Sequence, residues 1–324
     1  MLFTRDLRVH DHPALMAACA DADRVVPLFV FDDHVYGHAI ASPNKMAFLL
    51  DSVDDLAARL RDLGGALYRR RGRLVEQVGA VAAEAGADAV YLSDDVTAFA
   101  GARVDALRTG LDVDVQTFPG VTVVPPGELT TASGGAFQHF TPYWRAWQQR
   151  RHREPVGVPD AVRCPSTLAV GSSPELSELV HGELSPDLPR GGEAVGRARL
   201  EQWLARDVRS YDDGHDDLAG DCTSRLSPYL HLGCVSAAEV VACADRRRFG
   251  VDASSDRSAG ATSSIRWWRR RRHQHGTTTT TAVTHGAATT KRSRHGVTAG
   301  PATRLWTPAC GSCAARGGCT TAHA

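Results

Sequence analysis

The chain has 324 residues, 43% of them apolar, and its 37 basic residues balance 37 acidic ones. This length predicts one or two domains with a sizeable core, and the absence of any run of eighteen apolar residues excludes a helix that spans a membrane. No apolar signal segment opens the chain. The first five cysteines are scattered among apolar neighbours, which predicts reduced, mostly buried thiols in a cytoplasmic protein: Cys19, Cys164, Cys222, Cys234 and Cys243.

Strand and helix patterns alternate through the first 125 residues. This alternation predicts an α/β domain over 1–125, with a Rossmann-like parallel sheet covered by helices on both faces. The first residues resemble the end of a strand whose beginning is missing. No glycine-rich dinucleotide or P-loop motif follows a strand, which leaves ordinary nucleotide binding of those kinds unsupported. We expect strands at 24–31, 65–72, 88–94 and 112–118, and helices at 45–64, 74–86 and 102–111.

The middle of the chain changes character. Residues 126–195 are predicted to be a linker between domains, richest in proline, glycine and serine after about residue 153. Helical patterning resumes at 192–211 and 227–248. We therefore expect a helical domain to begin over 196–256.

The last 68 residues, 257–324, differ from the rest. They hold eleven basic residues and no acidic one, which leaves 26 basic and 37 acidic residues before them, and they contain only seven large apolar side chains. Such a segment cannot bury enough surface to offset its ordering entropy, so a disordered tail is predicted. Cys310, Cys313 and Cys319, with His323 as a fourth candidate, lack the paired spacing of a structural zinc site, and no metal site is predicted.

The stretch TSRLSPYLHLG, residues 223–233, carries the clearest chemistry. Pro228 suits the first helical position, which makes Ser227 the expected N-cap. Hydroxyls of Thr223 and Ser224 and the guanidinium of Arg225 would then meet free helix N–H groups, and this arrangement suits a pyrophosphate. The alternative is a capped helix with ordinary polar surface residues.

The whole stretch resembles the flavin-phosphate loop of the photolyase/cryptochrome family. So do, in the family's order, LFTRDLRVHDHPAL (2–15), resembling its first strand, loop and helix, and FTPYWRAW (140–147), resembling its interdomain signature. Tyr211 matches the tyrosine that precedes the loop. The resemblance covers residues 1–248, about three quarters of the chain.

The resemblance implies a carbon–carbon lyase that repairs cyclobutane pyrimidine dimers in DNA with light, by electron transfer from reduced FAD. The alternatives are a cryptochrome-like blue-light photoreceptor without repair activity, and an α/β domain that binds an antenna and performs no catalysis. The resemblance implies a monomer whose basic residues hold DNA phosphates, and it assigns no catalytic side chain here. The FAD-binding residues that it implies are Tyr211, Thr223, Ser224, Arg225, Leu226 and Ser227.

The resemblance also implies an antenna chromophore in the α/β domain, either 8-hydroxy-5-deazaflavin or a folate. Lys45 stands where arginine is commoner in the family. The alternative for this set is ordinary polarity at strand ends and helix surfaces. The matching residues are Phe31, Asp32, Lys45, Asp95 and Arg103.

A reading-frame shift offers an explanation for the tail. Reading codons for residues 306–322 one nucleotide earlier permits V-D-A-G-M-R-Q-L-R-G-E-G-W-M-H-N-R, which resembles the family segment that lines the flavin and substrate pocket. We therefore hypothesise a shift between about residues 248 and 276. The tail cysteines would then be frame-shifted codons, and the chain an impaired, truncated version of the ancestral enzyme.

Overall fold

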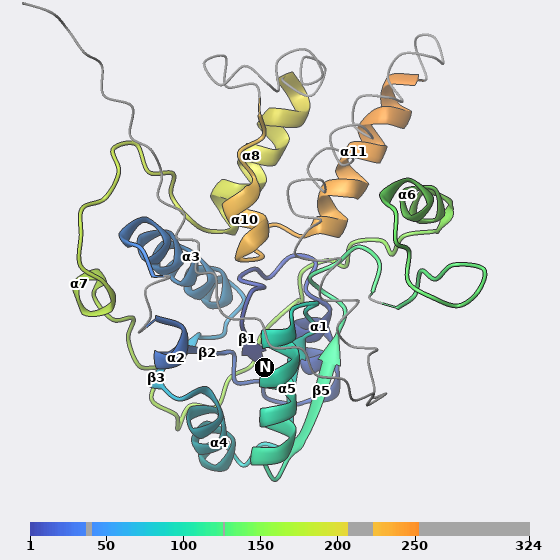
Figure 1. Cartoon of the computed structure of the whole chain (residues 1–324). Helices are drawn as coiled ribbons and strands as arrows, with labels where there is room; N and C mark the ends of the chain where they lie inside the picture. Colours follow the sequence, from blue (N-terminus) through green and yellow to red (C-terminus); the bar gives the residue numbers. More distant parts are fainter. Residues whose placement is uncertain (37–40, 126, 207–222, 253–324) are drawn as a thin grey trace, which may run out of the picture. The chain divides into compact units, whose positions relative to one another are not determined.

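The computed structural model describes residues 1–36, 41–125, 127–206 and 223–252 (Figure 1). Five parallel strands form one sheet in the order β3-β2-β1-β4-β5. The register places Leu2 beside Leu28 on one side and beside Leu92 on the other. The strands are β1 (Leu2–Phe3), β2 (Leu28–Asp32), β3 (Tyr68–Gly72), β4 (Ala89–Ser93) and β5 (Asp114–Phe118).

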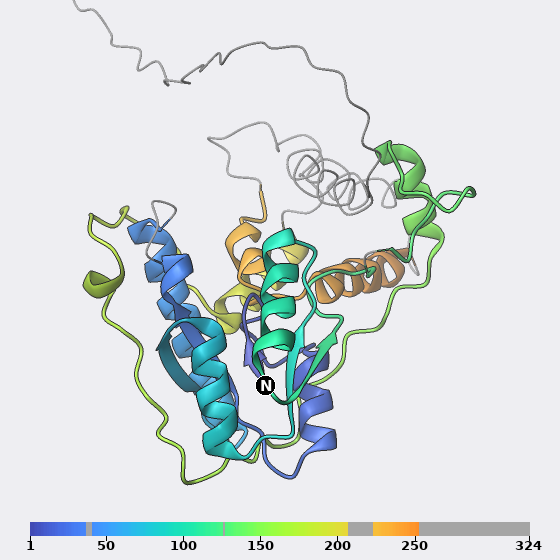
Figure 2. The same cartoon turned by 60° about the horizontal axis from the view of Figure 1, so that its bottom comes forward.

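Helices connect the strands and continue after the sheet (Figures 1 and 2). Within the α/β part they are α1 (Pro13–Asp21), α2 (Asp33–Tyr36), α3 (Pro43–Asp62), α4 (Leu74–Ala85) and α5 (Ala98–Gly110). Those that follow are α6 (Phe140–Gln149), α7 (Leu176–Leu179), α8 (Glu193–Arg206), α10 (Ser227–His231) and α11 (Ala237–Asp252).

Alternate side chains of β2 point to opposite faces of the sheet, so the strand contributes to two cores. Phe29 and Phe31 join the cluster formed with α1 and α3, whereas Leu28 and Val30 join the cluster formed with α4 and α5. All five β2 residues are buried, as expected for an inner strand covered on both faces.

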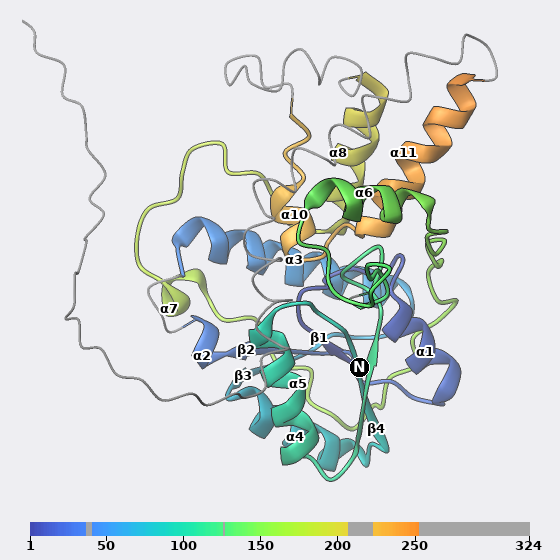
Figure 3. The ribbon, with the colours of Figure 1, turned by 45° about the vertical axis from the view of Figure 1, so that its right-hand side comes forward.

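Helices α7 and α8 contact α3, and buried residues of α8, α10 and α11 join the cluster that α3 forms on this side of the sheet (Figure 3). Phe48 of α3 meets Tyr229 of α10 edge-on, with 5.0 Å between ring centroids. Asp55 of α3 accepts hydrogen bonds from the backbone N–H groups of Glu193 at 2.7 Å and Ala194 at 3.4 Å, at the start of α8. A carboxylate at a helix N-terminus satisfies free N–H groups and favours the helix dipole, so α3 fixes where α8 begins.

The predicted α/β class and parallel sheet are confirmed, but several boundaries differ. The strand expected from residue 24 begins at Leu28, after Pro27, and the helix expected from 102 begins at Ala98, where the Thr97 hydroxyl accepts a hydrogen bond from the N–H of Ala100. The helix expected over 227–248 is two helices, α10 and α11, separated around Gly233 with φ of 68°. All described residues belong to one compact unit, so the predicted domain limits stay predictions.

The described cysteines are less buried than the sequence predicts. None of the described cysteines forms a disulfide, and only Cys234 is buried; Cys19, Cys164 and Cys243 are half-buried, which corrects the expectation of mostly buried thiols. Burial raises the pKa of the Cys234 thiol to about 11, so it stays protonated at neutral pH. Among described helices, none is long and apolar enough to span a membrane. The predicted disordered tail lies outside the described residues.

Candidate functional site

The carboxyl ends of β1 and β4 form the point where the strand order reverses. From β1 the chain continues outward to β2 and β3 on one side, whereas β4 and β5 lie on the other side. Open α/β sheets commonly bind ligands at such a reversal point. Arg5 follows β1 and Asp95 follows β4. The guanidinium Nη1 of Arg5 lies 3.1 Å from Oδ2 of Asp95, whose side chain is only 7% exposed. A cation and a carboxylate therefore pair at this edge of the sheet.

Two residues of the predicted antenna set, Asp32 and Arg103, meet at the same edge. Asp32 ends β2, and its Oδ2 lies 3.9 Å from Nη2 of Arg103 on α5. The guanidinium carbon of Arg103 lies 5.3 Å from the ring centroid of Phe99, a cation–π contact. Phe99 is 56% exposed. The structure thus brings Asp32 and Arg103 together and adds an exposed aromatic ring beside them.

Phe31 and Lys45 are placed differently from the rest of the predicted antenna set. The Phe31 ring is 1% exposed and packs edge-on against Phe29, so it forms part of the core. Lys45 is exposed on the first turn of α3, and no ion pair of the described residues joins it to Asp32, Asp95 or Arg103. Polar contacts of an antenna would therefore come from the other residues at the sheet edge.

The loop of residues 223–227 has an inner and an outer side. Leu226 is fully buried in the core with α3 and α8, and Ser224 is 2% exposed. The Ser224 hydroxyl accepts a hydrogen bond from the N–H of Leu226 at 3.4 Å, which holds the turn. Thr223 and Arg225 are exposed, and Ser227 is half-exposed. The side chains that can meet a ligand are therefore those of Thr223, Arg225 and Ser227.

Arg225 adopts an unusual backbone conformation, with φ of 49°. The left-handed region costs a non-glycine residue about 1–2 kcal/mol, so the buried neighbours must hold it there. Leu226, with φ of −79° and ψ of −4°, occupies the N-cap position of α10, and no side chain caps this helix. The expectation of Ser227 as N-cap is therefore wrong; Ser227 is the first helical residue, because the helix that follows the turn at Arg225 starts one residue earlier than expected.

The position of α10 depends on Tyr229. Its ring is fully buried against Phe48, and its hydroxyl donates to the carbonyl oxygen of Arg190 at 2.8 Å. Burial raises the pKa of this hydroxyl, which keeps it a donor. Tyr211, the remaining predicted FAD residue, lies outside the described residues. Residues 223–227 do not line the pockets of about 160 and 20 Å³ that lie beside Arg8 and Cys19.

Sequence reasoning missed Arg5 and Phe99 at the sheet edge. A charged residue directly after β1 at the reversal point was a usable signal for Arg5. Phe99 carried none, because an aromatic residue on the first turn of a helix is more often part of a core.

Comparisons with known proteins agree with this arrangement. The family model described as DNA photolyase matches residues 1–161. Over 247 residues the chain is 44% identical to a deoxyribodipyrimidine photo-lyase of Streptomyces griseus, covering 74% of this chain and 54% of that protein. It is 34% identical to a cryptochrome DASH of Gloeobacter violaceus, covering 72% and 50%.

A solved structure extends the similarity to the fold. A bacterial class III photolyase from Agrobacterium tumefaciens superposes with a TM-score of 0.71 at 25% identity, covering 84% of this chain and 57% of that one. The chain spans about half the length of the curated relatives it matches. With four sequence stretches in order, the five-stranded sheet and these relatives in agreement, the chain belongs to the DNA photolyase/cryptochrome family.

Proposed function

We propose that this chain holds the antenna-side sheet and the flavin-phosphate loop of a light-driven enzyme that repairs cyclobutane pyrimidine dimers in DNA. One observation carries the proposal: residues 223–227 present exposed hydroxyl and guanidinium groups on a turn that is anchored from beneath by Leu226. The relative with the name deoxyribodipyrimidine photo-lyase, at 44% identity, supports the reaction.

The donor set of this loop fits a pyrophosphate. Arg225 offers a charged, forked donor, and Thr223 and Ser227 offer hydroxyls beside it. Ser224 and Leu226 hold the turn in place from the buried side. When bound, reduced FAD would supply the light-excited electron that splits the dimer. Residues that would enclose its ring are, by the family resemblance, those after 248, and Tyr211 precedes the loop; nearly all lie outside the described residues.

We propose that the carboxyl edge of the sheet binds an antenna chromophore of the deazaflavin or folate class. Asp32, Asp95 and Arg103 provide both charge signs at one edge of the sheet, and Phe99 provides an exposed aromatic face. Planar heteroaromatic rings with polar substituents suit such a site, since aromatic stacking and hydrogen bonding act together there.

We propose that the substrate of this protein is DNA that contains pyrimidine dimers. Exposed arginines around the entrance of the proposed flavin and substrate pocket would hold the DNA phosphates. We also propose a monomer that works in the cytoplasm, and the free cysteines of the described residues support a reducing compartment.

The cryptochrome alternative has direct support, because a cryptochrome DASH is 34% identical to this chain. Both functions need flavin, and only the repair enzyme removes dimers from DNA. A dimer-repair assay under blue light, with a dark control, separates them.

An absorption spectrum of the purified protein tests the flavin loop first. We expect a flavin band, and Arg225→Ala is expected to weaken FAD retention about tenfold or more, because a charge-assisted contact to phosphate is lost. Arg73→Ala is the matched control, since Arg73 is 67% exposed and ion-paired with Glu76 on another surface. A deazaflavin band alone would favour the antenna-domain alternative. Equal FAD retention in wild type and Arg225→Ala would contradict the proposed loop.

A further inference from the structure

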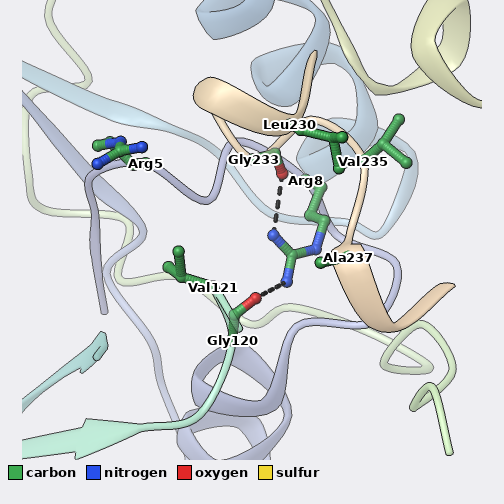
Figure 4. Close-up of a pocket in the computed structure, with 8 residues that line it drawn as sticks. All are labelled: Arg5, Arg8, Gly120, Val121, Leu230, Gly233, Val235 and Ala237. Atoms are coloured by element: carbon green, nitrogen blue, oxygen red, sulfur yellow. Dashed lines mark hydrogen bonds between the residues drawn. The ribbon is translucent and has the colours of Figure 1, made fainter. Parts of the chain in front are cut away.

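Arg8 is a buried cation where the loop of residues 4–12 meets the later helices. Its side chain is 1% exposed. Nη1 donates to the carbonyl oxygen of Gly233 at 2.9 Å, and Nη2 donates to that of Gly120 at 2.8 Å (Figure 4). Nε donates to the carbonyl oxygen of His10 at 3.1 Å. One guanidinium therefore joins its own loop, the segment after β5 and the turn between α10 and α11.

Asp11 joins two more segments to the same loop. Its φ is 51°, and its fully buried carboxylate accepts from the guanidinium of Arg153, from the N–H of Val156 at 2.9 Å and from the hydroxyl of Ser236. The Ser236 oxygen in turn accepts from the N–H of Ala238 at 3.1 Å, at the start of α11. The start of α11 is thus fixed to the loop and to the segment after α6.

Helices α8 and α11 make further contacts to the loop. The Glu193 carboxylate, at the first residue of α8, accepts from the N–H groups of Val9 at 2.8 Å and His10 at 3.2 Å. Oε1 of Glu239 in α11 lies 3.4 Å from Nδ1 of His10 and accepts from Nε of Arg197 at 2.8 Å. Both helices therefore dock on the loop through buried carboxylates.

Arg5 links this junction to the sheet edge. Its Nε donates to the carbonyl oxygen of His231, the last residue of α10, at 3.0 Å, while its Nη1 pairs with Asp95 at 3.1 Å. The same side chain therefore contacts a predicted antenna residue and the helix that begins with Ser227.

Apolar packing does not fill the junction. A cavity of about 160 Å³ lies beside Arg8, lined by Val121, Leu230, Val235 and Ala237 among others (Figure 4). The polar contacts of the loop therefore add to the apolar core that Leu226 and Tyr229 share with α3.

We propose that the loop of residues 4–12 is the positioning element that fixes the 223–227 loop relative to the carboxyl edge of the sheet, with Arg5 and Arg8 as positioning residues. The importance of this placement rests on the proposed function, because energy transfer from an antenna to a flavin depends steeply on their distance and orientation. The attachment itself needs no chromophore.

Hydrogen exchange measured by mass spectrometry on the chromophore-free chain tests the attachment. In Arg8→Met, amides of residues 226–240 are expected to exchange about 10- to 100-fold faster, as loss of buried charged hydrogen bonds predicts. Peptides covering β2 and β4 should keep wild-type protection. Unchanged exchange over 226–240, or an equal gain over the whole chain, would overturn the proposal.

Arg5 provides a second test that does not risk the core, since its side chain is 34% exposed. Arg5→Gln should speed exchange over 226–232, and Arg5→Lys, which keeps a cation opposite Asp95, should restore most of the protection. Equal loss in both variants overturns the role of the Arg5–Asp95 pair. Arg73→Gln, far from the junction contacts, should exchange as wild type. Because no flavin or DNA enters this measurement, its failure is distinct from failure of the proposed function.

Discussion

Replacing Gly233 by alanine is expected to weaken the docking of α10 and α11 strongly. Gly233 has φ of 68°, and a Cβ there would lie 2.6 Å from Cα of Asp6 and 2.7 Å from the carbonyl carbon of Arg5, with the Arg5 oxygen closer still. These are backbone atoms of the buried loop, so they cannot move aside as a flexible side chain would.

The expected cost has two parts. The left-handed conformation costs alanine about 1–2 kcal/mol, and forcing a methyl group into a packed site costs about 1–3 kcal/mol more. Gly86 provides the matched control, because its φ is 59° and nothing lies within 4 Å of a Cβ built there. Gly86→Ala should therefore carry the conformational cost alone, and Gly233→Ala should exceed it by about 1–3 kcal/mol.

Urea unfolding at neutral pH, followed by circular dichroism, measures both variants. For 150–250 ordered residues, each kcal/mol should also lower the melting temperature by about 2–4 °C. Equal losses in Gly233→Ala and Gly86→Ala, within about 0.5 kcal/mol, would refute the reasoning, since they would show that the loop yields to the added methyl group.

Two further predictions concern acid and the reading frame. Burial alone would raise the pKa of Asp11, but hydrogen bonds from Arg153 and Ser236 outweigh it and hold the pKa below its ordinary value of 3.8. The ionised Asp11 carboxylate therefore stabilises the fold fully above pH 3.8, and this stabilisation is lost as the pH falls through the lowered pKa of the folded state. Asp11→Asn should therefore make the free energy of unfolding depend less on pH in the acid range. An unchanged pH dependence would contradict this. Resequencing the coding DNA should show a frame shift between about residues 248 and 276, and an intact frame with no family-like segment beneath it would refute that hypothesis.

The sheet was predictable because its strands and helices are local patterns. Period-two and helical spacing mark each element, and errors arose at ends, where Pro27 and Thr97 decide the boundary. The break at Gly233 was not recognised, because a single glycine in a helical pattern is often tolerated. The helix breaks there because the backbone of Gly233 lies very close to the backbone of Arg5 and Asp6, which are far away in the sequence.

The candidate site was predictable only in part, because it too depends on contacts between residues that are far apart in the sequence. Residue types predict hydrogen-bond donors in the 223–227 loop, but which of these side chains face outward depends on how Leu226 and Ser224 are buried beneath them. Phe31 and Asp32 look equally plausible in sequence. Alternation along β2 places the Phe31 ring in the core, whereas Asp32 ends the strand and its Oδ2 lies 3.9 Å from Nη2 of Arg103.

Two of the stretches that resemble the family, 2–15 and 223–233, form one physical contact. The N–H of Leu7 donates to the carbonyl oxygen of Leu232 at 3.1 Å, beside the Arg8 contact to Gly233. This contact between the two stretches involves no flavin. A purified chain without flavin would thus argue against the enzyme and leave the junction intact, whereas loss of the junction in Arg8→Met is expected to displace the proposed flavin-phosphate loop of this chain.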